Sequence, residues 1–142
     1  MEVTVYLDTS VIVPLFMDEA FSSRSHDFLR SRAPVCLVSD FAAAEFSSAL
    51  ARRVRMGELI ADRARIAFGL FDDWMPRAAQ QVETAATDIS AAAAFIRRLD
   101  LPLRTPDALH IAIARRMGAS LVTFDDGMAA AARILGVAVD NA

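Results

Sequence analysis

Four acidic residues stand at positions from which their carboxylates could act as one group: Asp8, Glu45, Asp107 and Asp125. Asp8 and Asp125 each come directly after an apolar run with the composition of a buried β-strand. Asp107 follows a threonine and a proline, a typical helix start, and Glu45 lies near the beginning of an alanine-rich helix. The four acids are far apart in the sequence, so only the fold can bring them together.

A group of four carboxylates implies a particular chemistry. Two such charges ~4 Å apart repel by about 4 kcal/mol at an effective dielectric constant near 20, and a divalent cation removes that repulsion. A shell of oxygen ligands prefers Mg²⁺ or Mn²⁺. Ions of this kind activate water and stabilise the charged transition state of phosphodiester cleavage. The acids therefore predict a metal site for hydrolysis that needs no catalytic histidine or lysine.

The elements that must position these acids alternate between strand and helix. We expect strands at residues 3–8, 35–38, 81–83, 120–124 and 137–139. We expect helices at residues 11–16, 21–31, 41–56, 60–74, 89–99, 105–117 and 128–135. Apolar strands that alternate with helices predict an α/β fold, a three-layer α/β/α sandwich with a mostly parallel central sheet. No repeat or linker interrupts the pattern, so residues 1–142 are expected to form one domain.

In an open parallel sheet, functional residues gather at the carboxyl ends of the strands, so the four acids are expected to meet there. Each acid also has a simpler interpretation. Asp8 could be a loop residue, Asp107 a charge at a helix end, and Asp125 or Asp126 a helix cap. Glu45 is harder to explain in this way, because a half-buried carboxylate on an apolar helix face needs a partner.

Several other residues are expected to mark the ends of helices. The expected N-caps are Thr9 and Ser10, Ser39 and Asp40, Asp88, and Thr105. Gly57, Gly118 and Gly136 are expected to end helices, and Pro76 to lie beyond the helix at 60–74.

The composition narrows the classes of protein. All 15 basic residues are arginine, which excludes mechanisms that need a lysine, such as those of P-loop NTPases and phosphorelay receivers. The net charge of −3 argues against a non-specific nucleic-acid binder. The single Cys36 cannot form an internal disulfide and is expected in the core. The lack of a signal peptide and of a long apolar run predicts a cytoplasmic protein.

Four segments carry a recognisable pattern. They are residues 6–10 (Tyr-Leu-Asp-Thr-Ser), 39–45 (Ser-Asp-Phe-Ala-Ala-Ala-Glu), 103–112 (Leu-Arg-Thr-Pro-Asp-Ala-Leu-His-Ile-Ala) and 121–125 (Leu-Val-Thr-Phe-Asp). In order and spacing the chain resembles the PIN-domain ribonucleases, and specifically the VapC-type toxins of bacterial toxin–antitoxin pairs. The resemblance covers essentially the whole chain, and its strength comes from the four segments together.

The resemblance implies both a site and a function. The family's acidic quartet, which binds Mg²⁺ or Mn²⁺ and supports hydrolysis, is matched by Asp8, Glu45, Asp107 and Asp125. Ser10 and Thr123 match hydroxyl positions near the metal, although both are equally suited to caps or turns. The resemblance further implies an endoribonuclease acting on structured RNA, often transfer RNA, a homodimer, and inhibition by a cognate antitoxin. The alternative is a PIN-like module that holds RNA or protein without cutting it.

Further residues near these motifs leave alternatives open. Arg104 could contact a substrate phosphate, neutralise the acids or lie plainly on the surface. His110, three residues after Asp107 on the same helical face, is expected to be a structural histidine rather than a neighbour of the metal, and His26 to lie on the surface. Asp126 is expected to cap the helix that follows it. The arginines at 52, 53 and 55 suit a solvated face, an RNA contact or an edge that faces an antitoxin.

The expected middle helices contain many apolar side chains. Its aromatic part consists of Phe41, Phe46, Phe68, Phe71 and Trp74. Core packing explains most of it, and any exposed surplus would form a groove for an amphipathic helix of a partner, for which the antitoxin is the natural candidate.

Overall fold

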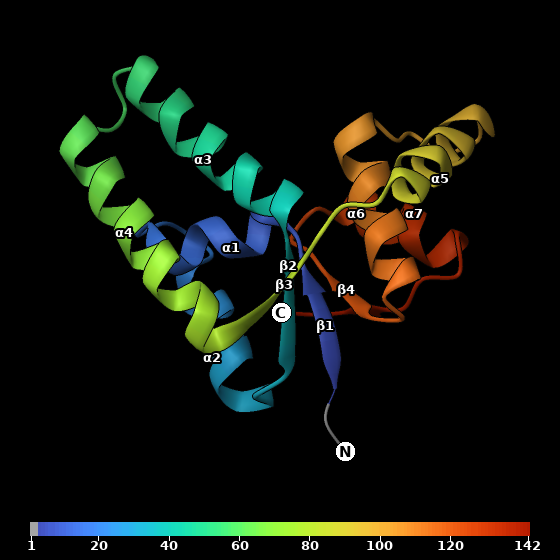
Figure 1. Cartoon of the computed structure of the whole chain (residues 1–142), viewed down its shortest axis with the longest axis horizontal. Helices are drawn as coiled ribbons and strands as arrows, with labels where there is room; N and C mark the ends of the chain where they lie inside the picture. Colours follow the sequence, from blue (N-terminus) through green and yellow to red (C-terminus); the bar gives the residue numbers. More distant parts are fainter. Residues whose placement is uncertain (1–2) are drawn as a thin grey trace.

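A five-stranded sheet lies at the centre of the molecule, and all neighbouring strands in it run parallel (Figure 1). The structure is a computed structural model that describes residues 3–142. The strands are β1 (Thr4–Leu7), β2 (Val35–Ser39), β3 (Ala79–Val82), β4 (Ser120–Val122) and β5 (Val139–Asp140). Their order is β3-β2-β1-β4-β5, which places β1 in the middle. Met1 and Glu2, which belong to the segment expected not to be a signal peptide, lie outside the described residues.

Helices cover both faces of this sheet (Figure 1). On one side lie α1 (Thr9–Phe16), α2 (Ser22–Arg32), α3 (Asp40–Arg55) and α4 (Ala61–Ala78). On the other lie α5 (Ala86–Arg97), α6 (Thr105–Arg116) and α7 (Asp126–Ile134). The predicted three-layer sandwich with a parallel sheet is therefore confirmed.

The sheet separates two apolar cores. Successive side chains of a strand point to opposite faces, so Val5 and Leu7 pack into the core below α1–α4, while Tyr6 packs into the core below α5–α7. All three are fully buried, as expected of a central strand in a parallel sheet. Tyr6 lies opposite Leu37 of β2 and Leu121 of β4 in the register of the sheet. This register brings the carboxyl ends of β1, β2 and β4 to one edge.

Most element boundaries agree with the expected ones, and the helix ends show where they differ. The left-handed conformations of Gly57, Gly118 and Gly136 follow α3, α6 and α7 as predicted. Pro76 was expected beyond its helix, but it lies inside α4, which runs on to Ala78. An interior proline removes a hydrogen bond and crowds the preceding turn, but Pro76 lies in the last turn of α4, which continues for only two residues beyond it.

The expected caps of α1, α5 and α6 are wrong. Asp8, not Thr9 or Ser10, occupies the N-cap position of α1. Arg104, not Thr105, occupies that position in α6. Asp88 lies inside the first turn of α5, where its Oδ2 accepts a hydrogen bond from the backbone N–H of Ala85 (2.8 Å). In each case the helix begins earlier than its apolar pattern, because polar residues of the first turn carry no apolar period.

Cys36 is buried in β2, as expected, and Phe46 and Phe71 belong to the core. Among residues 3–142, no helix is both long enough and apolar enough to span a bilayer.

Candidate metal centre

Asp8 is the buried member of the acidic group, with a relative exposure of 2%. It directly follows β1, and its backbone N–H donates to the carbonyl of Val122 in β4 (3.2 Å). Both of its carboxylate oxygens accept hydrogen bonds from hydroxyls. Ser10 Oγ donates to Oδ1 (2.7 Å) and Thr123 Oγ1 donates to Oδ2 (2.8 Å). The two hydroxyls that the family resemblance places near the metal therefore fix the orientation of Asp8.

Asp125 joins the same network from the end of β4. Its backbone N–H donates to Thr123 Oγ1 (3.0 Å), so that one threonine contacts both Asp8 and Asp125. Oδ1 of Asp125 accepts from the backbone N–H of Met128 (2.9 Å) and caps α7. The prediction that Asp126 is the cap is wrong. Asp125 has the extended backbone that an N-cap needs, whereas Asp126 is already the first helical residue.

Glu45 enters the site from the second turn of α3. Its Oε1 accepts hydrogen bonds from Thr9 Oγ1 (2.7 Å) and from the ring nitrogen Nε2 of His110. The Glu45 side chain is only 28% exposed and bonds to two partners. The expectation that a half-buried carboxylate needs a partner here is therefore confirmed. His110 is buried as predicted, but it does more than pack, because it bonds directly to one of the four acids.

A chain of buried hydrogen bonds continues behind His110. Ser39 Oγ accepts from the backbone N–H of Ala42 (2.9 Å) and lies 2.8 Å from the hydroxyl of Tyr6, which lies 2.7 Å from His110 Nδ1. Glu45 as a carboxylate only accepts, so Nε2 carries a proton. If Nδ1 also carried a proton, it would donate to the Tyr6 hydroxyl, and Tyr6 would donate to Ser39 Oγ. The hydroxyl hydrogen of Ser39 would then have no acceptor in this chain. The chain therefore runs in one direction, from Ala42 through Ser39 and Tyr6 to His110 and Glu45.

The two best-connected acids differ in their electrostatics. Burial raises the pKa of Asp8 above its usual value, and the charge of Glu45 adds to the rise, whereas the hydrogen bonds from Ser10 and Thr123 act against it. Burial acts to raise the pKa of Glu45 as well, but the hydrogen bonds from His110 and Thr9 outweigh it and leave this pKa below its usual value. A negative charge on Asp8 is thus costly in the protein alone, and a cation beside it would offset that cost.

Asp107 lies in the first turn of α6, one turn before His110, and is half-buried. Among residues 3–142 its side chain forms no hydrogen bond and no ion pair. Arg104 is exposed at the start of the same helix, and within the described chain it forms no ion pair with an acid. Its contact with a substrate phosphate remains a prediction, and the structure shows no neutralisation of the acids by this residue.

The donor set fits a hard divalent cation. The four side chains offer only carboxylate oxygens, and no arginine within residues 3–142 forms an ion pair with any of them. In the same part of the chain, no three acidic, histidine or cysteine side chains stand close enough to hold one ion by themselves. Mg²⁺ usually keeps several waters and binds through one or two carboxylates, so the arrangement is compatible with such an ion without a closed protein cage.

Three residues of this network were missed by sequence reasoning. The sequence predicts Thr9 and Ser39 only as caps, and Tyr6 only as a strand residue. One signal was available. A tyrosine at the centre of a fully apolar strand has a hydroxyl that must find a partner when buried. The identity of that partner was not accessible, because Tyr6 and His110 are 104 positions apart.

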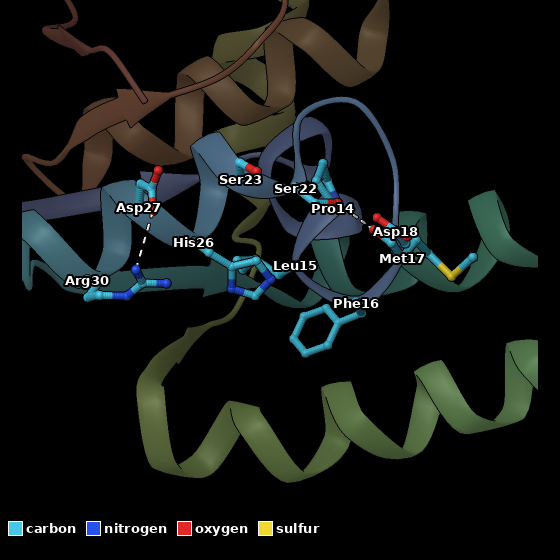
Figure 2. Close-up of a pocket in the computed structure, with 10 residues that line it drawn as sticks. All are labelled: Pro14, Leu15, Phe16, Met17, Asp18, Ser22, Ser23, His26, Asp27 and Arg30. Atoms are coloured by element: carbon cyan, nitrogen blue, oxygen red, sulfur yellow. Dashed lines mark hydrogen bonds and ion pairs between the residues drawn. The ribbon is translucent and has the colours of Figure 1, made fainter.

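Two cavities lie at the acidic site, and a third hollow lies away from it. One cavity is lined by Thr9, Glu45 and Arg52, and a second by Ser10, Phe21 and Asp125, among others. A further hollow lies between α1 and α2, where Figure 2 shows His26, Asp27 and Arg30 around it. None of the four acids lines this hollow. His26 is exposed, as expected.

Comparison with known proteins identifies the class. The model of the PIN domain family matches residues 5–134, which includes all four acids and every strand except β5. The chain belongs to the PIN domain family and is a VapC-type member of it.

Individual relatives agree with this assignment. The chain is 35% identical over 138 residues to Ribonuclease VapC46 of Mycobacterium tuberculosis, and the match covers 95% of each chain. Its fold is similar to that of VapC20 of M. tuberculosis, described as a sarcin-ricin loop cleaving toxin (TM-score 0.72, 22% identity, 89% of this chain and 94% of the other). It is also similar to VapBC2 from Rickettsia felis bound to a DNA fragment from its promoter (TM-score 0.70, 16% identity, 97% and 98%).

Proposed function

We propose that this protein is a metal-dependent endoribonuclease and the toxin of a VapBC-type toxin–antitoxin pair. Asp8, Glu45, Asp107 and Asp125 would hold Mg²⁺ or Mn²⁺. The observation that carries the proposal is a set of carboxylates at the carboxyl edge of a parallel sheet. Hydroxyls and a histidine hold those of Asp8 and Glu45, and none of the four forms an ion pair with an arginine in the described chain. The relationship to Ribonuclease VapC46 supports RNA as the substrate.

The chain's own residues have distinct roles in this proposal. Ser10 and Thr123 hold the carboxylate of Asp8, while Thr9 and His110 hold that of Glu45. Pre-oriented carboxylates of this kind do not have to reorganise when charge develops at the phosphate. A bound divalent ion supplies an activated water and stabilises charge on the phosphoryl oxygens.

The more exposed acids face the substrate side. Asp125 is exposed and Asp107 half-buried, so both can meet an ion and its waters at the surface. We assign the role of contacting an RNA phosphate to Arg104, which is exposed at the start of the helix that carries Asp107.

The substrate is proposed to be a structured RNA, with transfer RNA as one candidate. VapC20, whose fold is similar, is described as a sarcin-ricin loop cleaving toxin. Structured RNAs present unpaired nucleotides in loops, where a phosphodiester is accessible to a recessed acidic site.

An antitoxin is proposed as the protein partner, and the toxin itself is proposed to be a homodimer. Exposed apolar side chains lie on α4 (Ile66 and Leu70) and on the connection between α3 and α4 (Met56 and Ile60), and each is more than half exposed. The aromatic residues of the middle helices lie in or against the core, as expected for most of them, and the exposed surplus is aliphatic. This aliphatic surface suits the apolar face of an antitoxin helix.

The activity can be tested with purified protein, an RNA pool and Mn²⁺. We expect cleavage by the wild type, none after addition of a chelator, and none by Asp8→Asn, which keeps the shape of the side chain but removes its charge. RNA binding without any cleavage would favour the alternative, a non-cutting module. Equal cleavage by Asp8→Asn would contradict the proposed site.

A cellular test addresses the toxin role. Expression of the wild type should arrest growth, and Glu45→Ala should relieve that arrest. Undiminished arrest by a stably folded Glu45→Ala variant would remove the acids from the mechanism.

A further inference from the structure

The surface around the acids continues beyond them as two connected cavities. One, of about 500 Å³, contains Glu45 and Arg52, and the other, of about 390 Å³, contains Asp125. Thr9 and Arg53 line both, so the two cavities meet between the acids. A chain bound at the acids can therefore extend in two directions.

The far end of the second cavity is aromatic. Phe21, just before α2, and Phe124, just after β4, stack with ring centroids 4.6 Å apart and planes 19° apart. Both line the cavity that contains Asp125. Phe21 is 41% exposed, so this pair is an accessible surface and not a closed part of the core.

A guanidinium group lies beside the stacked rings. The central carbon of Arg24 is 5.3 Å from the ring centroid of Phe21 and 4.8 Å from that of Phe124. Arg24 also donates one hydrogen bond to the carbonyl of Ala142 (3.0 Å), which holds it in place. An aromatic surface next to a fixed cation suits unpaired nucleotides, because a base can stack on the rings and a phosphate can pair with the cation.

The cavity that contains Glu45 and Arg52 is lined by charged residues and, in the described chain, by no aromatic residue. Arg53 is engaged by Glu19 (2.7 Å). Arg52 is exposed and forms no ion pair within residues 3–142. The two ends are thus chemically different, one suited to a base and the other to a phosphate.

We propose that one unpaired nucleobase of the RNA substrate binds against the Phe21–Phe124 pair, at a fixed offset from the phosphate that is cut. The backbone then passes the acids, and a phosphate on the far side meets Arg52. This subsite rests on the proposed ribonuclease function and deepens it. It explains how a protein with a net charge of −3 binds a polyanion at a group of acids, since stacking contributes affinity that does not depend on charge.

The subsite also restricts the substrate. A base inside a regular duplex is covered by its neighbours and cannot reach an aromatic side chain, so the cut nucleotide must lie beside an unpaired one. Stacking tolerates different bases, because every base has an aromatic face. Selectivity at this position then comes from exposure of the base rather than from its identity.

Kinetics with a pool of single-stranded RNA of randomised sequence test the subsite. Phe21→Leu should raise KM roughly five- to a hundredfold and leave kcat nearly unchanged, as expected when stacking of one base is lost from substrate binding. Phe21→Trp should restore KM. Phe68→Leu is the matched control, since it removes an aromatic ring from α4 away from the acids, and it should leave KM unchanged. An unchanged KM for Phe21→Leu overturns the proposal.

A second readout does not depend on cleavage. In a Trp74→Phe background, Phe21→Trp places the only tryptophan of the protein in the subsite. The RNA pool should quench its emission, and inorganic polyphosphate of equal charge should not. Equal quenching by polyphosphate, or none by RNA, overturns the base-binding proposal. If the wild type cuts no RNA at all, the ribonuclease function fails, while this fluorescence measurement still decides the subsite.

Discussion

Removal of one hydroxyl tests the hydrogen-bond chain behind the acids. In Tyr6→Phe the ring stays in place, and only the link between Ser39 and His110 is lost. The change leaves the Ser39 hydroxyl without its acceptor and His110 Nδ1 without its donor. Both residues are buried, at 0% and 2% exposure, so bulk solvent does not replace the lost partner.

The expected loss of stability follows from these two groups. A buried polar group left without a partner costs about 1–3 kcal/mol, and part of that cost is offset because the phenol no longer has to be desolvated. We therefore expect the free energy of unfolding to fall by about 2–3 kcal/mol. For a chain of this length that corresponds to a drop in Tm of roughly 6–9 °C.

The same change should weaken metal binding. His110 keeps its bond to Glu45 but loses the partner that fixes the ring, and groups that orient metal ligands typically contribute ten- to a hundredfold in affinity. Tyr6 acts through His110, so we expect the lower end, an Mn²⁺ dissociation constant about tenfold higher by calorimetry. Ser25→Ala is the matched control. It removes another buried hydroxyl, which donates to the carbonyl of Val11 (3.0 Å), and it should lower stability without altering Mn²⁺ affinity.

Two results would refute this reasoning. The first is a Tyr6→Phe variant with wild-type Tm and wild-type Mn²⁺ affinity. The second concerns the direction of the chain, which requires the proton of His110 to be on Nε2. Long-range ¹H–¹⁵N correlation spectra that place the proton on Nδ1 alone would contradict it.

Other predictions concern an ion pair, a glycine beside Asp125 and a leucine with a left-handed backbone. Arg116 forms a bidentate pair with Asp88 (2.8 and 2.9 Å), and its hydrogen bonds outweigh the effect of burial and hold the pKa of Asp88 below its usual value. This pair therefore stabilises the fold above the unfolded pKa of about 4, and its contribution is lost as the pH falls through the lower folded pKa. In urea titrations Asp88→Asn should cost about 1–3 kcal/mol at neutral pH and flatten the loss of stability below pH ~4; an unchanged acid limb would contradict this. A Cβ on Gly127 would stand 3.3 Å from Oδ1 of Asp125, so Gly127→Ala should keep or raise Tm, because alanine favours a helix by about 1 kcal/mol, yet lower the rate of RNA cleavage; equal rates would count against Asp125. Leu99 is 89% exposed with a φ of 67°, so Leu99→Gly should raise the free energy of unfolding by about 1 kcal/mol, and a lower Tm would contradict that.

Much of the fold could be predicted from the sequence. Buried parallel strands are continuous apolar runs, whereas helices repeat their apolar residues about every 3.6 positions. Each of the five strands lies within two residues of its expected bounds, and each of the seven helices lies within four. The errors lie at helix starts such as Asp88 and Thr105, where polar side chains suit several positions. For Asp125 and Asp126 the choice between cap and first helical residue depends on one backbone angle, which the residue types do not determine.

The candidate site was partly accessible for a similar reason. The acids could be found from their positions after strands and at helix starts. Their environment could not, because the partners of Glu45 come from α1 and α6, far away in the sequence. The roles of Tyr6 and Ser39 depend on distances across the sheet that no local pattern reports.

Anomalous diffraction from crystals grown with Mn²⁺ tests the central claim most directly. We predict a manganese peak at the carboxyl edge of the sheet, with ligand oxygens from Asp8 and at least one of Glu45, Asp107 and Asp125, and no such peak in crystals of Asp8→Asn. A protein that cleaves RNA while its crystals show no manganese at these acids, or show it only elsewhere, would contradict the claim.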